Sequence, residues 1–478
     1  MIIKNTIGTV LFVQFALLTL LTACTPTPHD VKQSGEEADI YPDYKDVTIP
    51  VNIAPMNFLV RGAEAVEVKA GGLTIINRGG NVEFGMREWR RLVEENDTIE
   101  VEVTALKDGQ WTAYKHFCWY VVNDSIDSYL TYRLIEPDYS VWSRLQIKQR
   151  CVENYDEYAL SDYNLAGDRC MNCHVTANQN PQLSMMYVRG EGGGAILNQS
   201  GRLRKLNIKT ADMPANSTYF GFSSSGRYIA FSANTVIAAV HASASKRLEV
   251  YDTASDIYVA DIDKNKIIRS AILSDPNQLE TFPAFSPDGK YIYYCTSPRV
   301  ELPQQYKSLK YVLARIPFDE ATGTIGAEVD TMFTERSVCH PRVSPDGERI
   351  LFTVQDYGTF PIWHKEANLW MMDLRTGAVD TLKAVNSDRS DTYHSWSSNS
   401  RWFVFASKRD DGLYGKPYFC YLDRNGKAHK PFCLPQRNPS FYDDFLKSFN
   451  APEMARGRIP FDAVDVAYAM QLPPETFE

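Results

Sequence analysis

The stretch FSPDGKYIYYCTS, residues 285–297, decides the fold of this chain because it is one of four related copies. It joins a tight turn, in which Pro287 fixes φ and Gly289 accepts positive φ, to an apolar strand. The other copies are FSSSGRYIAFS from residue 222, VSPDGERILFTVQ from residue 343 and WSSNSRWFVFASK from residue 396. A second strand and turn follow each copy. Repeated units of this kind predict the blades of a β-propeller, and we expect about six blades over residues 195–478.

A second motif, Cys170-Met171-Asn172-Cys173-His174, has the C-x-x-C-H spacing of covalent c-type haem attachment. Each cysteine of such a motif can bind one haem vinyl group, and the histidine is the proximal iron ligand. A shuffled chain with 9 Cys and 8 His in 478 residues would contain roughly 0.003 such motifs. Half of a zinc site or a redox dithiol is the alternative, but the second ligand pair and the βαβ context are both missing. We therefore predict one covalent haem c at Cys170, Cys173 and His174.

The N-terminus predicts export. Residues 1–23 form a signal peptide, with Lys4 ahead of an apolar stretch. The stretch ends in Leu21-Thr22-Ala23-Cys24, which resembles a bacterial lipobox, so Cys24 is the predicted lipidation site; ordinary secretory cleavage is the alternative. Residues 24–44 then predict a polar tether. Together these features predict a protein anchored by lipid in the cell envelope and facing the periplasm, with the outer membrane favoured.

The chain between the tether and the repeats predicts two further parts. Residues 45–150 contain short alternating strands, one short helix over 86–95 and a hairpin at residues 107–110, and predict a β-sandwich. Residues 151–194 form a short haem-binding segment that is too small to bury a haem alone. We therefore expect an all-β chain, with the haem at the junction between an N-terminal β-sandwich and a C-terminal β-propeller.

The sixth ligand of the iron would decide its chemistry. Met185 and Met186 follow His174 closely and are candidate distal ligands, because a thioether raises the potential and suits electron transfer. Apolar packing is the alternative for both. Three histidines near predicted strand ends of different blades are alternative metal ligands, or else separate hydrogen-bonded side chains: His241, His364 and His394. His340 carries no comparable signal.

Composition narrows the function classes. The formal net charge is −9, from 50 basic and 59 acidic residues, and no block of Lys or Arg predicts a nucleic-acid partner. The G-x-S-x-G, H-E-x-x-H and P-loop motifs do not occur, so no catalytic residues are predicted. A single C-x-x-C-H also excludes a dihaem peroxidase.

These motifs carry a family resemblance. The S-P-D-G strands and the turn at Arg409-Asp410-Asp411-Gly412 resemble TolB-like, WD-type β-propellers. The whole chain, including EVYDTASD (residues 249–256) and YGTFPIWHKEA (residues 357–367), resembles exported bacterial lipoproteins in which C-x-x-C-H precedes such a propeller. The resemblance implies architecture and haem more than it implies a reaction.

Taken together, the sequence predicts a membrane-anchored monohaem c-type cytochrome that transfers electrons in the periplasm to an unidentified redox or protein partner. Two alternatives stay open. The first is a non-redox propeller that binds or scaffolds, with a structural or sensory haem. The second is a haem enzyme with an open distal site.

Overall fold

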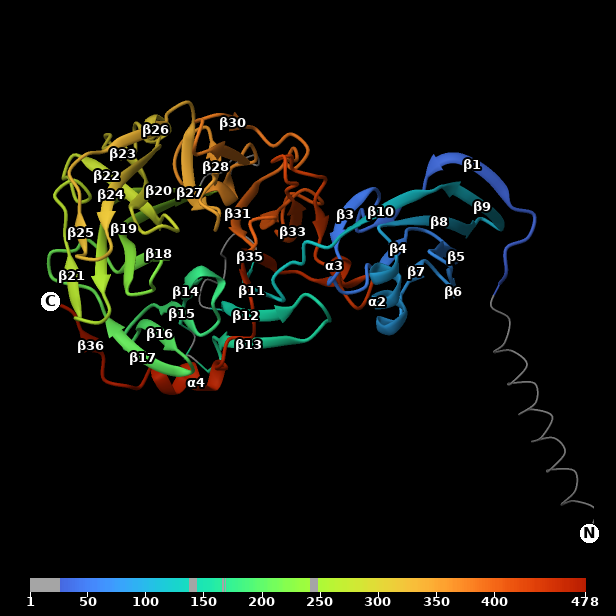
Figure 1. Ribbon diagram of the computed structural model, residues 1–478, viewed down its shortest axis with the longest axis horizontal. Helices are drawn as coiled ribbons and strands as arrows, with labels where there is room; N and C mark the ends of the chain where they lie inside the picture. Colours follow the sequence, from blue (N-terminus) through green and yellow to red (C-terminus); the bar gives the residue numbers. More distant parts are fainter. Residues whose placement is uncertain (1–25, 137–143, 166, 168, 241–247) are drawn as a thin grey trace, which may run out of the picture. The chain divides into compact units, whose positions relative to one another are not determined.

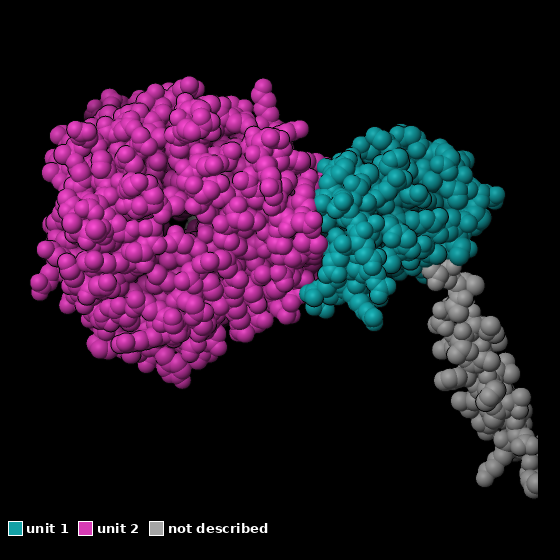
Figure 2. All heavy atoms as spheres, in the orientation of Figure 1, with its two compact units in different colours: residues 1–46, 55–121, 436–443 teal, residues 47–54, 122–435, 444–478 magenta. Residues whose placement is uncertain are grey.

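The computed structural model describes residues 26–136, 144–165, 167, 169–240 and 248–478, so Cys24 and His241 lie outside the described residues. The described chain is almost entirely β, which confirms the predicted fold class. It divides into two compact units (Figure 2). Unit 1 comprises residues up to 46, 55–121 and 436–443, and unit 2 comprises residues 47–54, 122–435 and 444–478.

The described residues of unit 1 form two sheets and one well-formed helix. The larger sheet has the order β1 (Lys32–Glu37), β9 (Gln110–Lys115), β8 (Thr98–Lys107), β10 (Phe117–Val122), with β5 (Ala65–Ala70) and β6 (Leu73–Arg78) added beside β8. The smaller sheet consists of β2 (Ile40–Tyr41), β4 (Phe58–Val60) and β7 (Asn81–Val82). Helix α2 spans Met86–Glu95, as predicted.

Aromatic side chains join the two sheets of unit 1. Phe58 of the small sheet lies edge-on to Trp119 of the large sheet, with ring centroids 6.5 Å apart. Trp89 of α2 packs on the same indole at 5.4 Å. This packing of one sheet on another agrees with the predicted β-sandwich. The predicted tether over residues 24–44 contains a strand, because β1 pairs in parallel with β9, Lys32 opposite Thr112.

Unit 2 is a β-propeller whose described residues form six blades around a central channel (Figure 1). From the channel outward, blade 1 consists of β35 (Ser448–Ala455), β11 (Tyr129–Ile135), β12 (Gln146–Cys151) and β13 (Glu157–Asp162). Blade 2 consists of β14 (Met171–Thr176), β15 (Leu183–Val188), β16 (Gly194–Gln199), β17 (Arg202–Asn207) and β36 (Glu475–Thr476). Blade 3 consists of β18 (Ser217–Phe222), β19 (Tyr228–Val240), β20 (Leu248–Asp261) and β21 (Lys266–Ile268).

The other three blades follow in chain order. Blade 4 consists of β22 (Gln278–Phe285), β23 (Tyr291–Pro298), β24 (Val312–Asp319), β25 (Thr324–Ile325) and β26 (Asp330–Phe333). Blade 5 consists of β27 (Ser337–Val343), β28 (Arg349–Gln355), β29 (Asn368–Asp373) and β30 (Val379–Asp380). Blade 6 consists of β31 (Asp391–Trp396), β32 (Trp402–Ser407), β33 (Lys416–Tyr421) and β34 (Phe432–Cys433).

The described chain also contains several short elements. They are the short strand β3 (Val47–Pro50), the 3-10 turns η2 (Ala177–Gln179), η3 (Tyr306–Ser308) and η4 (Pro361–Trp363), and the helices α3 (Phe441–Asp444) and α4 (Ala463–Ala469). Within the described ranges, no helix is both long and apolar enough to cross a membrane.

The repeated turns form as their sequence predicts. The Ser286 hydroxyl donates to Asp288 (2.6 Å) and accepts the backbone N–H of Tyr291 (3.0 Å). The Ser344 hydroxyl does the same with Asp346 (2.6 Å) and the N–H of Arg349 (3.0 Å). Serine, aspartate and glycine at fixed positions thus close each turn by local hydrogen bonds.

Blade 1 closes the propeller by combining strands from distant parts of the chain. Strand β35 pairs with β11, Tyr129 opposite Ala455 and Ile135 opposite Ser448. This differs from the predicted boundaries at residues 150 and 194, because β11 to β13 form blade 1, and β14 and β15 belong to blade 2. The 151–194 segment is therefore built into blades and does not form a separate piece between two domains.

Each inner strand contains a one-residue bulge. The pairing register between the first and second strands of every blade shifts by one residue, so one residue of the inner strand has no partner. Six residues at these shifts have positive φ: Cys173 (58°), Tyr219 (50°), Phe282 (55°), His340 (53°), Tyr393 (49°) and Ala451 (46°). We call these six residues the bulge ring. A bulge bends a strand and redirects its side chains, so the ring controls what faces the channel.

Closure by β35 gives a stability prediction. Met454 is fully buried in β35 (0% exposed), so Met454→Ala should lower the free energy of unfolding by about 2–5 kcal/mol through lost burial and a residual cavity. Leu446→Ala is the control, because Leu446 is 63% exposed and its truncation should leave the unfolding midpoint almost unchanged. Equal effects of the two substitutions in denaturant titrations would contradict the role of β35.

Candidate functional site

The channel of unit 2 contains a cavity of about 390 Å³, which we call the channel cavity. Figure 2 shows an opening near the middle of this unit. The cavity volume is within the roughly 300–1,000 Å³ that is usual for small-molecule sites. Five members of the bulge ring line the cavity: Cys173, Tyr219, His340, Tyr393 and Ala451. Most of the residues at the strand bulges therefore also line the cavity.

The C-x-x-C-H motif lies at this cavity. Cys173 and His174 line it directly. Cys170 is buried in a cluster with Ile362, and Trp363 packs against that cluster; both of these residues line the cavity. In a regular strand, residues three apart point to opposite faces, but the bulge at Cys173 interrupts this alternation. Cys170 is a buried free thiol.

His174 has the properties of a ligand donor. Its burial and the nearby Arg133 guanidinium lower the pKa of His174 to about 3, so the imidazole is neutral at neutral pH. The backbone at Thr131 and Ala451 partly opposes this shift, but neither ring nitrogen makes a hydrogen bond of ordinary geometry. A neutral imidazole is the form that binds a metal.

His340 is a second imidazole of this kind, and sequence analysis missed it. It is 6% exposed, burial lowers its pKa well below the ordinary value, and neither ring nitrogen has a hydrogen-bond partner among the described residues. One signal could have found it. His340 stands four residues before the turn serine Ser344, as Phe282 stands before Ser286, so the repeat alignment assigns both to the bulge ring.

The charged side chains of the channel cavity are all cationic. Arg133, Arg189 and Arg342 line it, and its described lining contains no Asp or Glu. Arg133 is held in place by donating to Asn450 Oδ1 at 2.5 Å. Three guanidinium groups beside apolar walls suit a largely apolar ligand that carries carboxylates or another anionic group.

A long hairpin forms one side of the cavity. Strands β19 and β20 are longer than the other strands of their blade, and Val236, Ala238, Leu248 and Val250 of this hairpin line the cavity. Asp252 anchors the hairpin. Its carboxylate accepts hydrogen bonds from Asn234 Nδ2 (2.9 Å), the Tyr311 hydroxyl (3.2 Å) and the Thr359 hydroxyl (3.2 Å).

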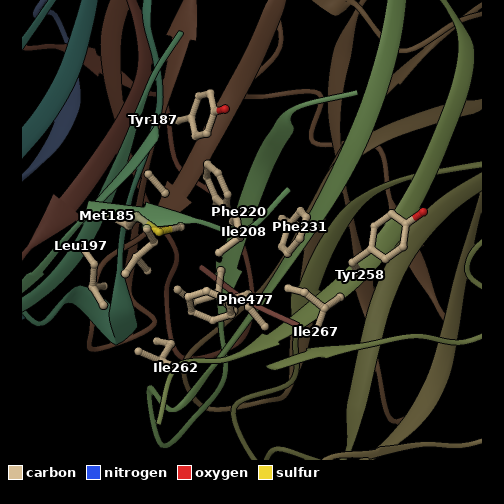
Figure 3. Close-up of a cluster of buried hydrophobic side chains, with 14 of the residues drawn as sticks. Met185, Tyr187, Leu197, Ile208, Phe220, Phe231, Tyr258, Ile262, Ile267 and Phe477 are labelled. Atoms are coloured by element: carbon tan, nitrogen blue, oxygen red, sulfur yellow. The ribbon is translucent and has the colours of Figure 1, made fainter. Parts of the chain in front are cut away.

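Met185 and Met186 occupy apolar clusters and do not line the channel cavity. Figure 3 shows Met185 packed among Leu197, Phe220 and other side chains of a buried cluster. Met186 belongs to a different cluster with Met171. Both residues lie on β15, the second strand of blade 2, one strand away from the channel. Their geometry supports apolar packing and gives no support to iron ligation.

Of the other predicted histidines, His364 and His394 make separate contacts, and His241 lies outside the described residues. His364 Nδ1 contacts Glu366 Oε1 at 2.8 Å, and His394 Nε2 contacts the Leu351 carbonyl at 2.9 Å. Neither lines the channel cavity. In the part of the chain that the structure describes, no three His, Cys, Asp or Glu side chains group so as to hold a metal ion.

Comparisons with known proteins add little about function. No family model matches the chain, and no curated protein matches it. A Synechocystis apocarotenoid oxygenase structure is 14% identical, covers 85% of this chain and 95% of its own, and has a TM-score of 0.38. A DUF4784 family protein from Bacteroides caccae is 10% identical, covers 87% and 98%, and has a TM-score of 0.33. An oligogalacturonate lyase in complex with manganese is 11% identical, covers 63% and 72%, and has a TM-score of 0.35. These similarities carry no argument about the site.

The buried Asp252 gives a pH prediction. Burial raises its pKa from 3.8 to about 6, so the folded protein holds this proton more tightly than the unfolded chain does. Stability should therefore fall as pH rises from about 4 to 6, and Asp252→Asn should remove this fall. Between pH 4 and pH 8, the free energy of unfolding of Asp252→Asn should rise by up to about 3 kcal/mol relative to that of wild type.

Asp388→Asn is the matched control, because Asp388 is an exposed carboxylate. Urea titrations at the two pH values should show the relative gain for Asp252→Asn and none for Asp388→Asn. A difference between Asp252→Asn and wild type that is the same at both pH values would refute the assignment.

Proposed function

We propose that this protein is an exported, lipid-anchored monohaem c-type cytochrome that transfers single electrons, with its haem in the channel cavity. The observation that carries the proposal is that Cys173 and His174, adjacent in the C-x-x-C-H motif, line a cavity that also contains three arginines. When bound, haem c supplies one-electron chemistry at its iron.

Each part of the cavity matches one requirement of that cofactor. The Cys170 and Cys173 thiols would each add across one vinyl group, forming a C–S bond and passing the thiol hydrogen to the vinyl carbon. His174, neutral and without a hydrogen bond of ordinary geometry, would bind the iron as the proximal ligand. Arg133, Arg189 and Arg342 would pair with the propionates.

The apolar wall of the cavity has a separate role. Phe220, Phe360 and Ile362 line the cavity and would exclude water from a bound macrocycle. A dry, low-dielectric surrounding is one of the ways by which a protein sets a reduction potential. Because the described lining contains no acidic side chain, the local charge would favour the reduced iron.

The second candidate is a non-redox binding protein whose channel takes an anionic small molecule. The three arginines favour this candidate, because their positive charges attract an anion and the described cavity lining holds no carboxylate that would neutralise them. The two candidates differ in covalent attachment. If the protein matures without haem and instead binds a dicarboxylate in calorimetry, with binding lost in Arg342→Ala, the second candidate is correct.

The first test is covalent attachment. Full-length protein produced with haem c maturation machinery should give a haem-stained band on a denaturing gel, and Cys170→Ala/Cys173→Ala should abolish the stain. Cys295→Ala/Cys339→Ala is the matched control, because these free thiols are buried in blades 4 and 5 and do not line the cavity. An unstained wild type would show that the chain is not a c-type cytochrome.

The second test concerns anchoring. Cys24 is the predicted lipidated residue, so Cys24→Ser should move the protein from the detergent phase to the soluble envelope fraction. Cys118→Ser in unit 1 removes a thiol outside the lipobox and should leave partitioning unchanged. Retention of Cys24→Ser in the membrane fraction would mean that another feature anchors the chain.

A further inference from the structure

The order of the inner strands places His340 across the channel from His174. These strands contact one another in the sequence β35, β14, β18, β22, β27, β31 and back to β35. Two inner strands therefore separate β14 from β27 in either direction, so that these two face each other (Figure 1). Cys173 and His340 are the bulge-ring members of these opposite strands, and His174 follows Cys173. The motif histidine and His340 thus line the cavity from opposite sides.

Aromatic rings hold the His340 imidazole in place without bonding to its nitrogens. The ring centroids of Phe282 and Tyr393 lie 4.2 Å and 4.6 Å from the His340 ring, and that of Tyr219 lies at 6.0 Å. Both nitrogens are buried and without a hydrogen-bond partner among the described residues. Leaving a buried polar group without a partner destabilises the fold, so a ligand in the cavity that binds one of these nitrogens would remove this penalty.

The placement of the two donors on opposite inner strands distinguishes the possible ligands. A bare metal ion needs several donors grouped around one point, and no such group occurs among the described residues. A haem iron instead needs only one donor from the protein on each face of the macrocycle. His174 and His340, on opposite sides of one cavity, therefore suit a haem iron better than a bare metal ion.

We infer that His340 and His174 would be the two protein ligands of the haem iron. The inference rests on the proposed function and completes it, because two histidine ligands leave no open position on the iron. It replaces Met185 and Met186, which lie one strand away from the channel. It also disfavours the haem enzyme with an open distal site. Compared with a methionine ligand, a second histidine gives a lower reduction potential.

The test uses full-length protein matured with haem and compares four forms: wild type, His340→Gly, His340→Met and His394→Ala. Glycine suits position 340 because His340 has a φ of 53°, so this substitution introduces no backbone strain. His394 is the matched control, a buried histidine of the neighbouring inner strand β31 that does not line the cavity. Haem staining, ferric electron paramagnetic resonance, carbon monoxide binding to the reduced protein and redox titration are the readouts.

We expect wild type and His394→Ala to be low-spin and not to bind carbon monoxide. His340→Gly should retain covalent haem, become high-spin and bind carbon monoxide, and added imidazole should restore the low-spin signal. His340→Met should acquire the near-infrared sulfur-to-iron band and a higher potential. Rescue by imidazole and the sulfur-to-iron band both report ligation of the iron, and a merely structural role of His340 would produce neither.

Two results would overturn the inference, and they are distinguishable. If wild type carries covalent haem but His340→Gly keeps the wild-type spectrum, His340 is not the ligand, while the proposed function stands. If wild type carries no covalent haem, the proposed function and this inference both fail.

Discussion

The closure of six blades into one ring is the constraint on which the rest of the structure depends. Strand β35, near the C-terminus, becomes the inner strand of a blade whose other three strands lie more than half of the chain earlier, and the pairing of Tyr129 with Ala455 fixes its register. Because a propeller has a circular core, each inner strand contacts two neighbours, and a shift in one strand would disturb the channel. The pairing of β35 with β11 therefore stabilises a cavity whose lining includes Arg133 of β11 and Ala451 of β35.

The bulge ring links this closure to chemistry. Non-glycine residues rarely adopt positive φ, and such residues persist only where the surrounding structure requires them. In this chain all six inner strands carry one, and five of the six side chains line the channel cavity. Four blades contribute a large side chain to the ring and blade 1 contributes Ala451. Blade 2 contributes Cys173, so a residue of the C-x-x-C-H motif occupies a structurally equivalent position to His340 of blade 5.

Local turn chemistry explains which parts of the fold could be predicted from sequence. Blades 3 to 6 contain serine-based turns whose hydrogen bonds involve neighbouring residues, as at Ser286 and Asp288, so the sequence alone predicts them. Blades 1 and 2 lack that motif, and the partner of β11 lies far along the chain, so the boundary at residue 194 missed them. The β1 strand was missed for the same reason, because its partner β9 is distant in sequence.

The site was predictable only in part. The C-x-x-C-H spacing drew attention to Cys173 and His174, which line the channel cavity, whereas the candidates Met185 and Met186 are buried in apolar clusters on the second strand of blade 2. His340 and the three arginines come together only through the ring. Mass spectrometry of peptides from the matured protein tests most directly whether a haem is bound covalently at the channel. We predict that the peptide containing Cys170 and Cys173 carries the mass of one haem. The same peptide recovered with two unmodified cysteines would contradict it.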